Sequence, residues 1–186
     1  MSQKPYVIGI CGGTCSGKST LADNLDKIFS KKYNVFVFHM DDYYKEIYIK
    51  TIAPITRKEY PEHNHPDAID VDILYNDFMG AISSIESDIV IIEGLFSFYF
   101  DQLREQLDLK VFVDLKSDER MYRRIKRWIN DQTLDEIAIR YLDTVRYRHD
   151  EFVEPTRWYA DVVINGTLDT NLGISMLVSY IEKQLQ

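Results

Sequence analysis

Short apolar runs alternate along the chain with segments whose apolar residues recur every three or four positions. Short continuous runs are typical of buried strands, and the longer period is typical of amphipathic helices. The runs predict five strands, at 6–11, 35–38, 89–92, 111–113 and 162–164. Nearly continuous apolar strands that alternate with helices predict a parallel sheet covered by helices on both faces, which is a three-layer α/β sandwich.

The helices expected between these strands have recognisable periods and ends. Apolar residues repeat with the helical period at 21–29, at 70–85 and at 172–185. A further helix is expected to begin at Thr133, because Glu136 stands three residues later, as a capping box requires. That helix is expected to end at Pro155, which has no backbone N–H to donate.

The segment from Tyr43 to Pro66 shows no clear period and includes Pro54 and Pro61 among mixed charges. A loop of this length inside a compact domain is usually a lid or a binding element. The alternative is that the segment contains secondary structure that its pattern does not reveal.

Composition narrows the classes of function. The 186 residues include 30 Asp and Glu against 22 Lys and Arg, for a net charge of −8. A dedicated nucleic-acid binder needs a basic surface, so this acidity argues against one, whereas a local arginine cluster could still bind a small anion. No apolar stretch approaches the roughly 20 residues that cross a bilayer, and no secretory signal is recognisable. These features predict a cytoplasmic protein without a membrane partner.

Residues 12–19, Gly-Gly-Thr-Cys-Ser-Gly-Lys-Ser, fit the pattern G-x-x-x-x-G-K-[ST] between a strand and a helix. In this context glycines let backbone amides surround phosphate oxygens at a helix N-terminus. Lys18 is expected to reach the terminal phosphates of a nucleotide, and the Ser19 hydroxyl to bind Mg²⁺. The residues expected to contact the nucleotide are Gly12, Gly13, Thr14, Cys15, Ser16, Gly17, Lys18, Ser19 and Thr20.

The two cysteines, Cys11 and Cys15, lie beside and within this loop. They offer no disulfide framework, and no further metal or redox ligands stand close to them in sequence. We expect them to be small side chains that fit a tight turn.

Acidic residues follow the ends of predicted strands. Asp41 and Asp42 come after the second strand, and Glu93 closes the third. Because the carboxyl ends of parallel strands line one crevice, these carboxylates should converge with the phosphate loop. Glu93 is then placed to bind Mg²⁺, and one Asp to accept a proton from an attacking hydroxyl. The alternative for the Asp pair is a turn or helix cap, and Asp114 is the rival metal ligand.

A basic cluster lies on one predicted helix and consists of Arg120, Arg123, Arg124, Lys126 and Arg127. Helical spacing puts Arg120, either Arg123 or Arg124, and Arg127 on one face. This face is either an ordinary solvated surface or a cationic lid that neutralises a transferring phosphate.

Two histidines flank an asparagine at His63-Asn64-His65. Without a third ligand at metal-binding spacing they make a weak metal site. A structural or substrate-contacting role is the expectation.

Together these motifs resemble the phosphoribulokinase/uridine kinase family of small-molecule kinases. The resemblance implies a P-loop kinase fold, ATP and Mg²⁺ as cofactors, and phosphorylation of a primary hydroxyl, often the 5′-hydroxyl of a nucleoside. The matching segments keep the family's order over nearly the whole chain. They lie at 12–20, 40–44, 65–70, 93–94, 112–118, 123–127, 152–156 and 159–164.

By motif position, the resemblance implies a role for each matched residue. Asp41 would be the general base and Lys18 the phosphate clamp, with Arg123 and Arg127 completing the catalytic set and Ser19 and Glu93 binding the metal. The implied substrate contacts are Asp42, Tyr44, Asn64, His65, Asp67 and Arg123. The domain would span 1–186, with a lid at about 120–135 and an acceptor-site loop at about 43–67.

Three departures from the family pattern concern the acceptor. Pyrimidine nucleoside kinases carry a base-reading hairpin between the H-P-D-A segment and the E-G strand, where this chain has only the helix at 71–85. Asn64 stands where uridine kinases place a sugar-binding Asp, and the lid lacks a later Arg-Gly step. Nicotinamide riboside kinases also lack the hairpin, although they do not share the H-P-D-A segment.

Several activities fit these features. The first is an ATP-dependent kinase acting on a nucleoside or riboside, and the alternatives are a nicotinamide riboside-type or other metabolite kinase, or a nucleotide-binding regulator without transfer activity. A switch GTPase is disfavoured because no N-K-x-D tetrad is present. The expected partner is a small hydroxyl acceptor, and assembly with copies of itself is left open.

Overall fold

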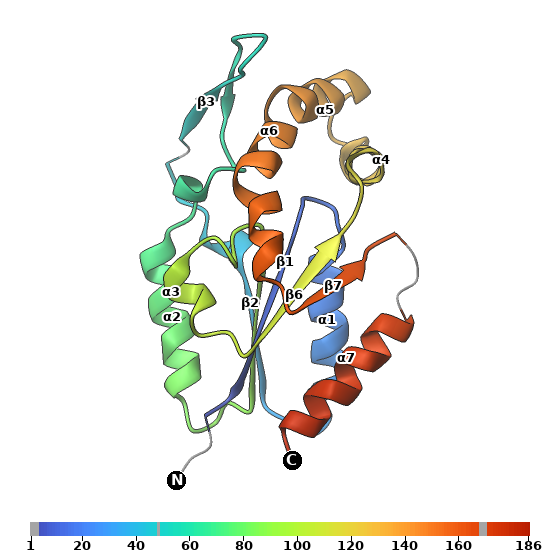
Figure 1. The fold of residues 1–186 in the computed structure, drawn as a ribbon. Coiled ribbons are helices and arrows are strands. Elements are labelled where there is room, and N and C mark those ends of the chain that lie inside the picture. Colours follow the sequence, from blue (N-terminus) through green and yellow to red (C-terminus); the bar gives the residue numbers. More distant parts are fainter. Residues whose placement is uncertain (1–3, 48, 168–170) are drawn as a thin grey trace.

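The computed structural model describes residues 4–47, 49–167 and 171–186. The interpretation of residues 1–6 as lacking a targeting signal therefore falls partly outside the described residues. Five parallel strands form the central sheet, in the order β2-β5-β1-β6-β7 (Figure 1). They are β1 (Tyr6–Gly12), β2 (Val35–His39), β5 (Ile89–Gly94), β6 (Leu109–Asp114) and β7 (Val162–Asn165). The predicted α/β fold with a five-stranded parallel sheet is confirmed.

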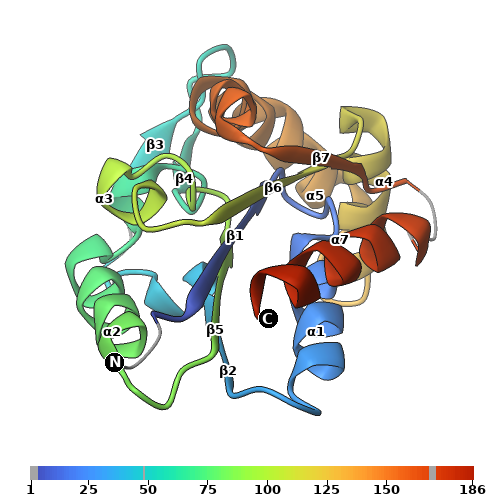
Figure 2. The ribbon, with the colours of Figure 1, turned by 60° about the horizontal axis from the view of Figure 1, so that its bottom comes forward.

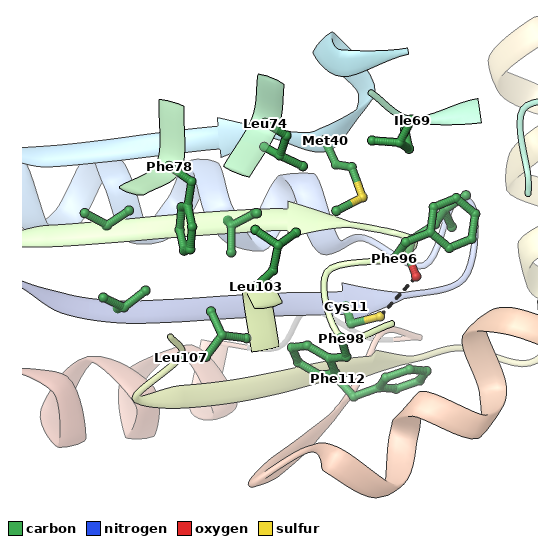
Figure 3. Close-up of a cluster of buried hydrophobic side chains, with 14 of the residues drawn as sticks. Cys11, Met40, Ile69, Leu74, Phe78, Phe96, Phe98, Leu103, Leu107 and Phe112 are labelled. Carbon is green, nitrogen blue, oxygen red and sulfur yellow. Dashed lines mark hydrogen bonds between the residues drawn. The ribbon is translucent and has the colours of Figure 1, made fainter. Parts of the chain in front are cut away.

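Helices cover the two faces of the sheet. One face is covered by α1 (Lys18–Phe29) and α7 (Asn171–Gln184), and the other by α2 (Val71–Ser83) and the short α3 (Asp101–Arg104) (Figure 2). Because successive side chains on a strand point to opposite faces, Ile8 and Ile10 pack against α1 and α7, while Val7 and Cys11 pack on the side of α2. Figure 3 shows the cluster of buried apolar side chains on the α2 side of the sheet.

The outer strands are less covered than the inner ones. Every residue of β5 is buried, whereas Phe36 of β2 is 40% exposed and Val163 of β7 is 45% exposed. The prediction that helices cover both faces of the sheet is confirmed, and these exposed side chains lie on β2 and β7. Both are edge strands, which pair with a neighbouring strand on one side only.

The segment 43–66 is not an irregular loop, so the second of the two interpretations is correct: the segment contains secondary structure that its pattern does not reveal. It contains an antiparallel hairpin of β3 (Lys50–Ile52) and β4 (Glu59–Pro61). Each strand has only three residues, too few for an alternating pattern, and Pro61 ends the second strand. The hairpin stands apart from the main sheet, beside the helices that follow β6 (Figure 1).

Those helices lie beyond the carboxyl end of the sheet. They are α4 (Ser117–Trp128), α5 (Leu134–Arg140) and α6 (Arg146–Arg148), the last flanked by π-helical turns at Tyr141–Val145 and His149–Val153. Thr133 and Glu136 form the predicted capping box. The α- and π-helical run ends at Val153, and Pro155 lies in the 3₁₀ helix that follows, so Pro155 changes the helix type without ending helical structure. None of the described helices is both long and apolar enough to span a membrane.

Candidate active site

The carboxyl ends of the inner strands lie in register. His39 of β2 pairs beside Glu93 of β5, and Cys11 of β1 pairs beside Gly94. This register brings the loop after β1, the 3₁₀ helix Met40–Tyr43 after β2, and Glu93 to one edge of the sheet. These three segments converge because the carboxyl ends of parallel strands lie at the same edge of the sheet.

The loop from Gly12 to Gly17 connects β1 to the first turn of α1. Gly17 has a φ of 107°, a left-handed conformation that favours glycine, and Lys18 begins the helix. A β-carbon on Gly13 would lie 2.5 Å from Nη1 of Arg120, so this position has no room for a larger residue. The backbone at Gly13, just before this helix, therefore lies close against the Arg120 side chain.

Two arginines of α4 brace this loop. The buried Arg120 donates from Nε to the Leu115 carbonyl at 3.0 Å and packs against Gly13. Arg123 donates to the carbonyls of Ser16 at 3.3 Å and Gly166 at 2.6 Å. Both guanidinium groups thus bind backbone oxygens around the loop.

Glu93 is the centre of a polar cluster at the end of β5. Its Oε1 accepts a 3.0 Å hydrogen bond from Ser19 Oγ and lies 2.9 Å from Nδ1 of His39, while Oε2 lies 4.0 Å from Lys18 Nζ. Burial lowers the pKa of His39, but the hydrogen bond and charge of Glu93 outweigh it, so the pKa of His39 is raised.

The donor set of this cluster suits a magnesium ion. Glu93 is buried, and its Oε2 has no hydrogen-bond partner among the described residues. A hard cation is bound by such a carboxylate oxygen and by a hydroxyl such as that of Ser19, with water filling the remaining positions. The described residues contain no cluster of three or more His, Cys, Asp or Glu that could hold a metal ion, which leaves this sparse carboxylate–hydroxyl pair.

A cavity of about 280 Å³ lies between the phosphate loop and the hairpin segment. Lys18, Ser19, Asp41 and Tyr44 are among the residues that line it. Tyr44 donates from its hydroxyl to the His63 carbonyl at 2.8 Å, and burial together with the charge of Asp41 raises the pKa of Tyr44. The phenol therefore stays neutral beside the Asp41 carboxylate.

The remaining wall of the cavity comes from His63, Asn64 and the helices that follow β6. It includes Arg124, Arg127, Trp128, Gln132 and Arg140. Arg124 lies over the Trp128 ring, 4.5 Å from its centroid, and donates to Thr14 Oγ1 at 3.3 Å. The wall is therefore polar and strongly cationic.

A second cavity, of about 220 Å³, lies at the first turn of α1. Gly17, Thr20 and Arg123 line only this cavity, and Cys15, Lys18, Ser19 and Arg127 line both cavities. The two cavities adjoin at the first turn of the helix, so groups bound in each would meet at Lys18.

Some residues predicted for the site lie outside both cavities. Asp42 is exposed in its 3₁₀ helix. His65 Nδ1 accepts from the Asp67 amide at 3.1 Å, and its ring packs on Phe152 with centroids 4.6 Å apart. This pair caps the next 3₁₀ helix, which is a structural role. Asp114, the rival metal ligand, pairs with Arg157 at 3.2 Å.

Other cavity residues carry no motif that sequence analysis could use. Arg140 ends α5, and Trp128 and Gln132 follow the basic cluster, so only the packing of α4 and α5 brings them to the cavity. Arg124 belonged to the predicted cluster, but its spacing did not separate it from Arg123. The two side chains point to different cavities.

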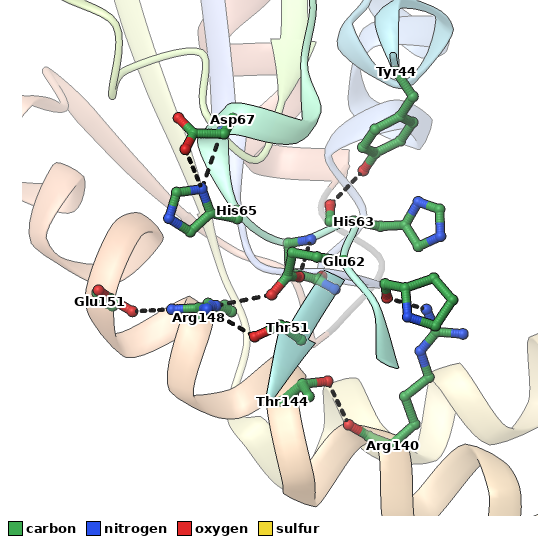
Figure 4. A network of polar contacts seen from close by, with 12 residues as sticks. Tyr44, Thr51, Glu62, His63, His65, Asp67, Arg140, Thr144, Arg148 and Glu151 are labelled. Carbon is green, nitrogen blue, oxygen red and sulfur yellow. Dashed lines mark hydrogen bonds and ion pairs between the residues drawn. The ribbon is translucent and has the colours of Figure 1, made fainter. Parts of the chain in front are cut away.

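The hairpin is fixed to the helices by an ion-pair network (Figure 4). Arg148 donates from Nε to Glu62 Oε2 at 2.9 Å and from Nη2 to Thr51 Oγ1 at 2.9 Å. The other oxygen of Glu62 accepts from the Asn64 amide at 2.7 Å. Arg140 donates to the Pro61 carbonyl at 2.9 Å. These contacts hold the strand that carries His63 and Asn64 into the cavity.

Comparison with known proteins gives a consistent result. The sequence profile of the phosphoribulokinase/uridine kinase family matches residues 7–85 and 81–172. A uridine kinase of Chlamydia pneumoniae is 33% identical, with 97% of this chain and 90% of that protein covered. A uridine kinase of Clostridium botulinum strain Okra is 32% identical, with 99% of each covered.

Solved structures share the fold. A putative fructose transport system kinase from Silicibacter sp. TM1040 superposes with a TM-score of 0.65 at 16% identity, covering 87% of this chain and 90% of that one. A possible uridine kinase from Bacillus stearothermophilus superposes with a TM-score of 0.56 at 21% identity, covering 88% and 90%. At these identities the similarity establishes the fold alone.

Proposed function

Because this chain belongs to the phosphoribulokinase/uridine kinase family, we propose that it transfers the γ-phosphate of ATP to a primary hydroxyl of a small molecule, a nucleoside or riboside. The relatives named uridine kinase match it over nearly their whole length. One observation carries the proposal beyond family membership. Lys18 and Ser19 of the phosphate loop line the same cavity as Asp41.

The two adjoining cavities suit the two substrates. The donor phosphates would lie along the loop 12–20, where backbone amides and the start of α1 favour negative charge. Lys18 and Arg127 line both cavities and would neutralise the phosphoryl group as it passes from one to the other. Arg123, which lines only the second cavity, would serve the donor side.

Asp41 is the proposed general base. Asp41 lines the same cavity as Lys18, so its carboxylate would orient the acceptor hydroxyl and accept its proton. The neutral Tyr44 hydroxyl and the Asn64 amide would position the acceptor beside it. Neither His65 nor Asp67 lines the cavity, so we assign them to the support of this segment.

Ser19 and Glu93 are the proposed Mg²⁺ ligands. The buried Glu93 Oε2 without a hydrogen-bond partner among the described residues supports this assignment. When bound, Mg²⁺ would supply charge neutralisation for the donor phosphates.

We further propose one kinase domain over residues 1–186, with 120–135 acting as a lid and 43–67 as the acceptor-site segment. The lid would close over the cavities and exclude water, which suppresses hydrolysis of the donor. Between the H-P-D-A segment and β5 the chain has the helix α2 and a short connection, which leaves no base-reading hairpin at that point.

A phosphoryl-transfer screen tests this function. Purified protein with ATP and Mg²⁺ is assayed for ADP formation with nucleosides, ribosides, vitamins and sugars added one at a time. A kinase shows little hydrolysis alone and a large increase with its acceptor. Slow hydrolysis that no acceptor changes would instead support a nucleotide-dependent regulator.

A further inference from the structure

The acceptor-side cavity carries far more positive than negative charge. Lys18, Arg124, Arg127 and Arg140 line it, and Asp41 is the one carboxylate among its described lining residues. Burial and the charges of Arg140 and Arg124 lower the pKa of His63 despite the opposing effects of Glu62 and Asp41. The imidazole thus adds no positive charge at neutral pH, and the excess resides in the three arginines and Lys18.

Two of these cations also line the cavity proposed for the donor nucleotide. Lys18 and Arg127 line both cavities, so the phosphates of ATP account for them. Arg124 and Arg140 line only the acceptor-side cavity. Their charges are therefore available to the molecule that occupies that cavity.

Neither of these two arginines forms an ion pair with another described residue. In the described part of the chain, the ion pairs of arginine involve Arg104, Arg148 and Arg157, and none involves Arg124 or Arg140. Burial, with a further contribution from Arg140, lowers the pKa of Arg124, and its buried Nε has no hydrogen-bond partner among the residues that the structure describes. Two neighbouring cations without an anion repel each other, and a bound anion would relieve this repulsion.

The contacts of the two side chains hold them in place without neutralising them. Arg124 stacks on Trp128 and donates to Thr14, and Arg140 donates to the Pro61 carbonyl. Each guanidinium has five N–H donors in a planar fork, so both retain donors for a carboxylate or phosphate.

We propose that Arg124 and Arg140 form an anion subsite, so that the acceptor carries a carboxylate or phosphate group in addition to the hydroxyl that is phosphorylated. This inference rests on the proposed kinase function and narrows its substrate class. A neutral nucleoside would leave both guanidinium groups in the cavity without a counter-ion.

Matched pairs of compounds test this inference. The pairs are glycerate against glycerol, glycerol 3-phosphate against glycerol, and orotidine, which is uridine with a carboxylate on its base, against uridine. Each compound is titrated calorimetrically into protein saturated with MgADP, which occupies the donor site, and is then assayed as an acceptor with MgATP. The carboxylate and phosphate arms identify which anion the subsite takes.

We expect the anionic member of at least one pair to bind and react at least about tenfold better than its neutral partner, the size of one charge-assisted contact. Arg140→Gln should lower binding and turnover of the anionic member much more than those of the neutral member, and so remove most of that preference. Arg140→Lys should restore part of the preference. The control is Arg146→Gln, since Arg146 does not line either cavity and bonds to Tyr147.

Several results would overturn the anion subsite. They include equal or better binding of the neutral members, an anion preference that Arg140→Gln leaves intact, and anion binding that MgADP abolishes, which would place the arginines on the donor. An equal loss for neutral and anionic members in Arg140→Gln would likewise show a structural role through Pro61. If neutral nucleosides are phosphorylated rapidly and anionic acceptors are not, the subsite is refuted and the kinase function is supported. MgATP binding without any acceptor transfer would count against the kinase function, and the calorimetric comparison would still decide the subsite.

Discussion

The Ser19 hydroxyl donates a 3.0 Å hydrogen bond to Glu93 Oε1, although 74 positions separate the two residues. The parallel pairing of β1 with β5 produces this contact, because it sets the loop after one strand beside the end of the other. The contact links the residue that follows the phosphate-loop lysine to Glu93, whose Oε2 accepts no hydrogen bond from the described residues, and it motivates the first prediction.

Glu93→Gln should weaken magnesium binding. The change removes the charge but keeps the shape, and we expect affinity for the metal to fall by about 10- to 100-fold, the range for groups that support a metal site. Metal-dependent stabilisation of the ADP-bound protein in thermal unfolding measures it. Asp114→Asn is the matched control, because Asp114 also ends a strand but pairs with Arg157. Equal effects of the two changes would contradict the assignment.

Asp41→Asn should separate nucleotide binding from transfer. Loss of a general base typically costs about 10²- to 10⁴-fold in rate, whereas an exposed side chain on the acceptor side contributes little to binding of MgATP. Single-turnover transfer and calorimetric titration of a non-hydrolysable ATP analogue measure the two effects. Asp42→Asn, one residue along and outside the cavity, is the control. Normal transfer by Asp41→Asn would exclude Asp41 as the base.

Lys18→Ala should impair both nucleotide binding and transfer. Lys18 lines both cavities, so its ammonium group meets the donor phosphates before transfer and the moving phosphoryl group during it. We expect a rate loss of about 10²- to 10³-fold, comparable with removing one charge-stabilising donor. Lys27→Ala, on the last turn of the same helix, should leave both properties unchanged. A variant that bound MgATP as tightly as the original protein would conflict with this role.

Arg148→Met should destabilise the protein by leaving a carboxylate buried. Glu62 has a side-chain exposure of 2% and Arg148 one of 25%, and breaking a buried ion pair costs about 3 kcal/mol. Urea unfolding measures the change. Arg157→Met should cost less than about 1 kcal/mol, because the Arg157–Asp114 pair is exposed at 39% and 41%.

The same network can be tested with a second substitution. Adding Glu62→Gln to Arg148→Met should recover part of the lost stability, since no charge is then left buried. Further destabilisation in the double variant would show that the two residues stabilise the fold independently.

Protonation of His149 should make the protein sensitive to acid. Burial and the charge of Arg120 lower the pKa of His149 to about 3. Glu154 lies 3.4 Å from Nε2, but its carboxylate is 45% exposed and also faces Arg157, so burial dominates. The unfolded chain binds this proton near pH 6.5, so the stabilising contribution is complete above pH 6.5 and is lost as the pH falls from 6.5 toward 3.

His149→Gln should reduce this acid sensitivity. Between pH 6.5 and 5 the original protein should lose about 2 kcal/mol of unfolding free energy through His149, at about 1.4 kcal/mol per pH unit. Urea unfolding at several pH values compares the two slopes. His65→Gln, which changes a histidine that stays partly exposed, is the control. Identical slopes for His149→Gln and the original protein would refute the effect.

Local patterns in the sequence determined the sheet, the phosphate loop and the approach of Glu93 to that loop. Apolar strand runs and glycines at a strand–helix turn act through neighbouring residues, and parallel strand ends meet at one edge in any such sheet. These features therefore followed without knowledge of the packing.

Tertiary packing decided which arginine faces which cavity. Neighbouring helical residues point about 100° apart, so Arg123 and Arg124 must face different surroundings. Only the packing of α4 against the phosphate loop determines which cavity each side chain lines. The hairpin β3–β4 and Arg140 came from the structure alone, because three-residue strands carry no period and Arg140 reaches the cavity only where α5 packs beside Pro61. The general chemistry of the site is thus encoded locally, whereas its selectivity for an acceptor depends on contacts between distant segments.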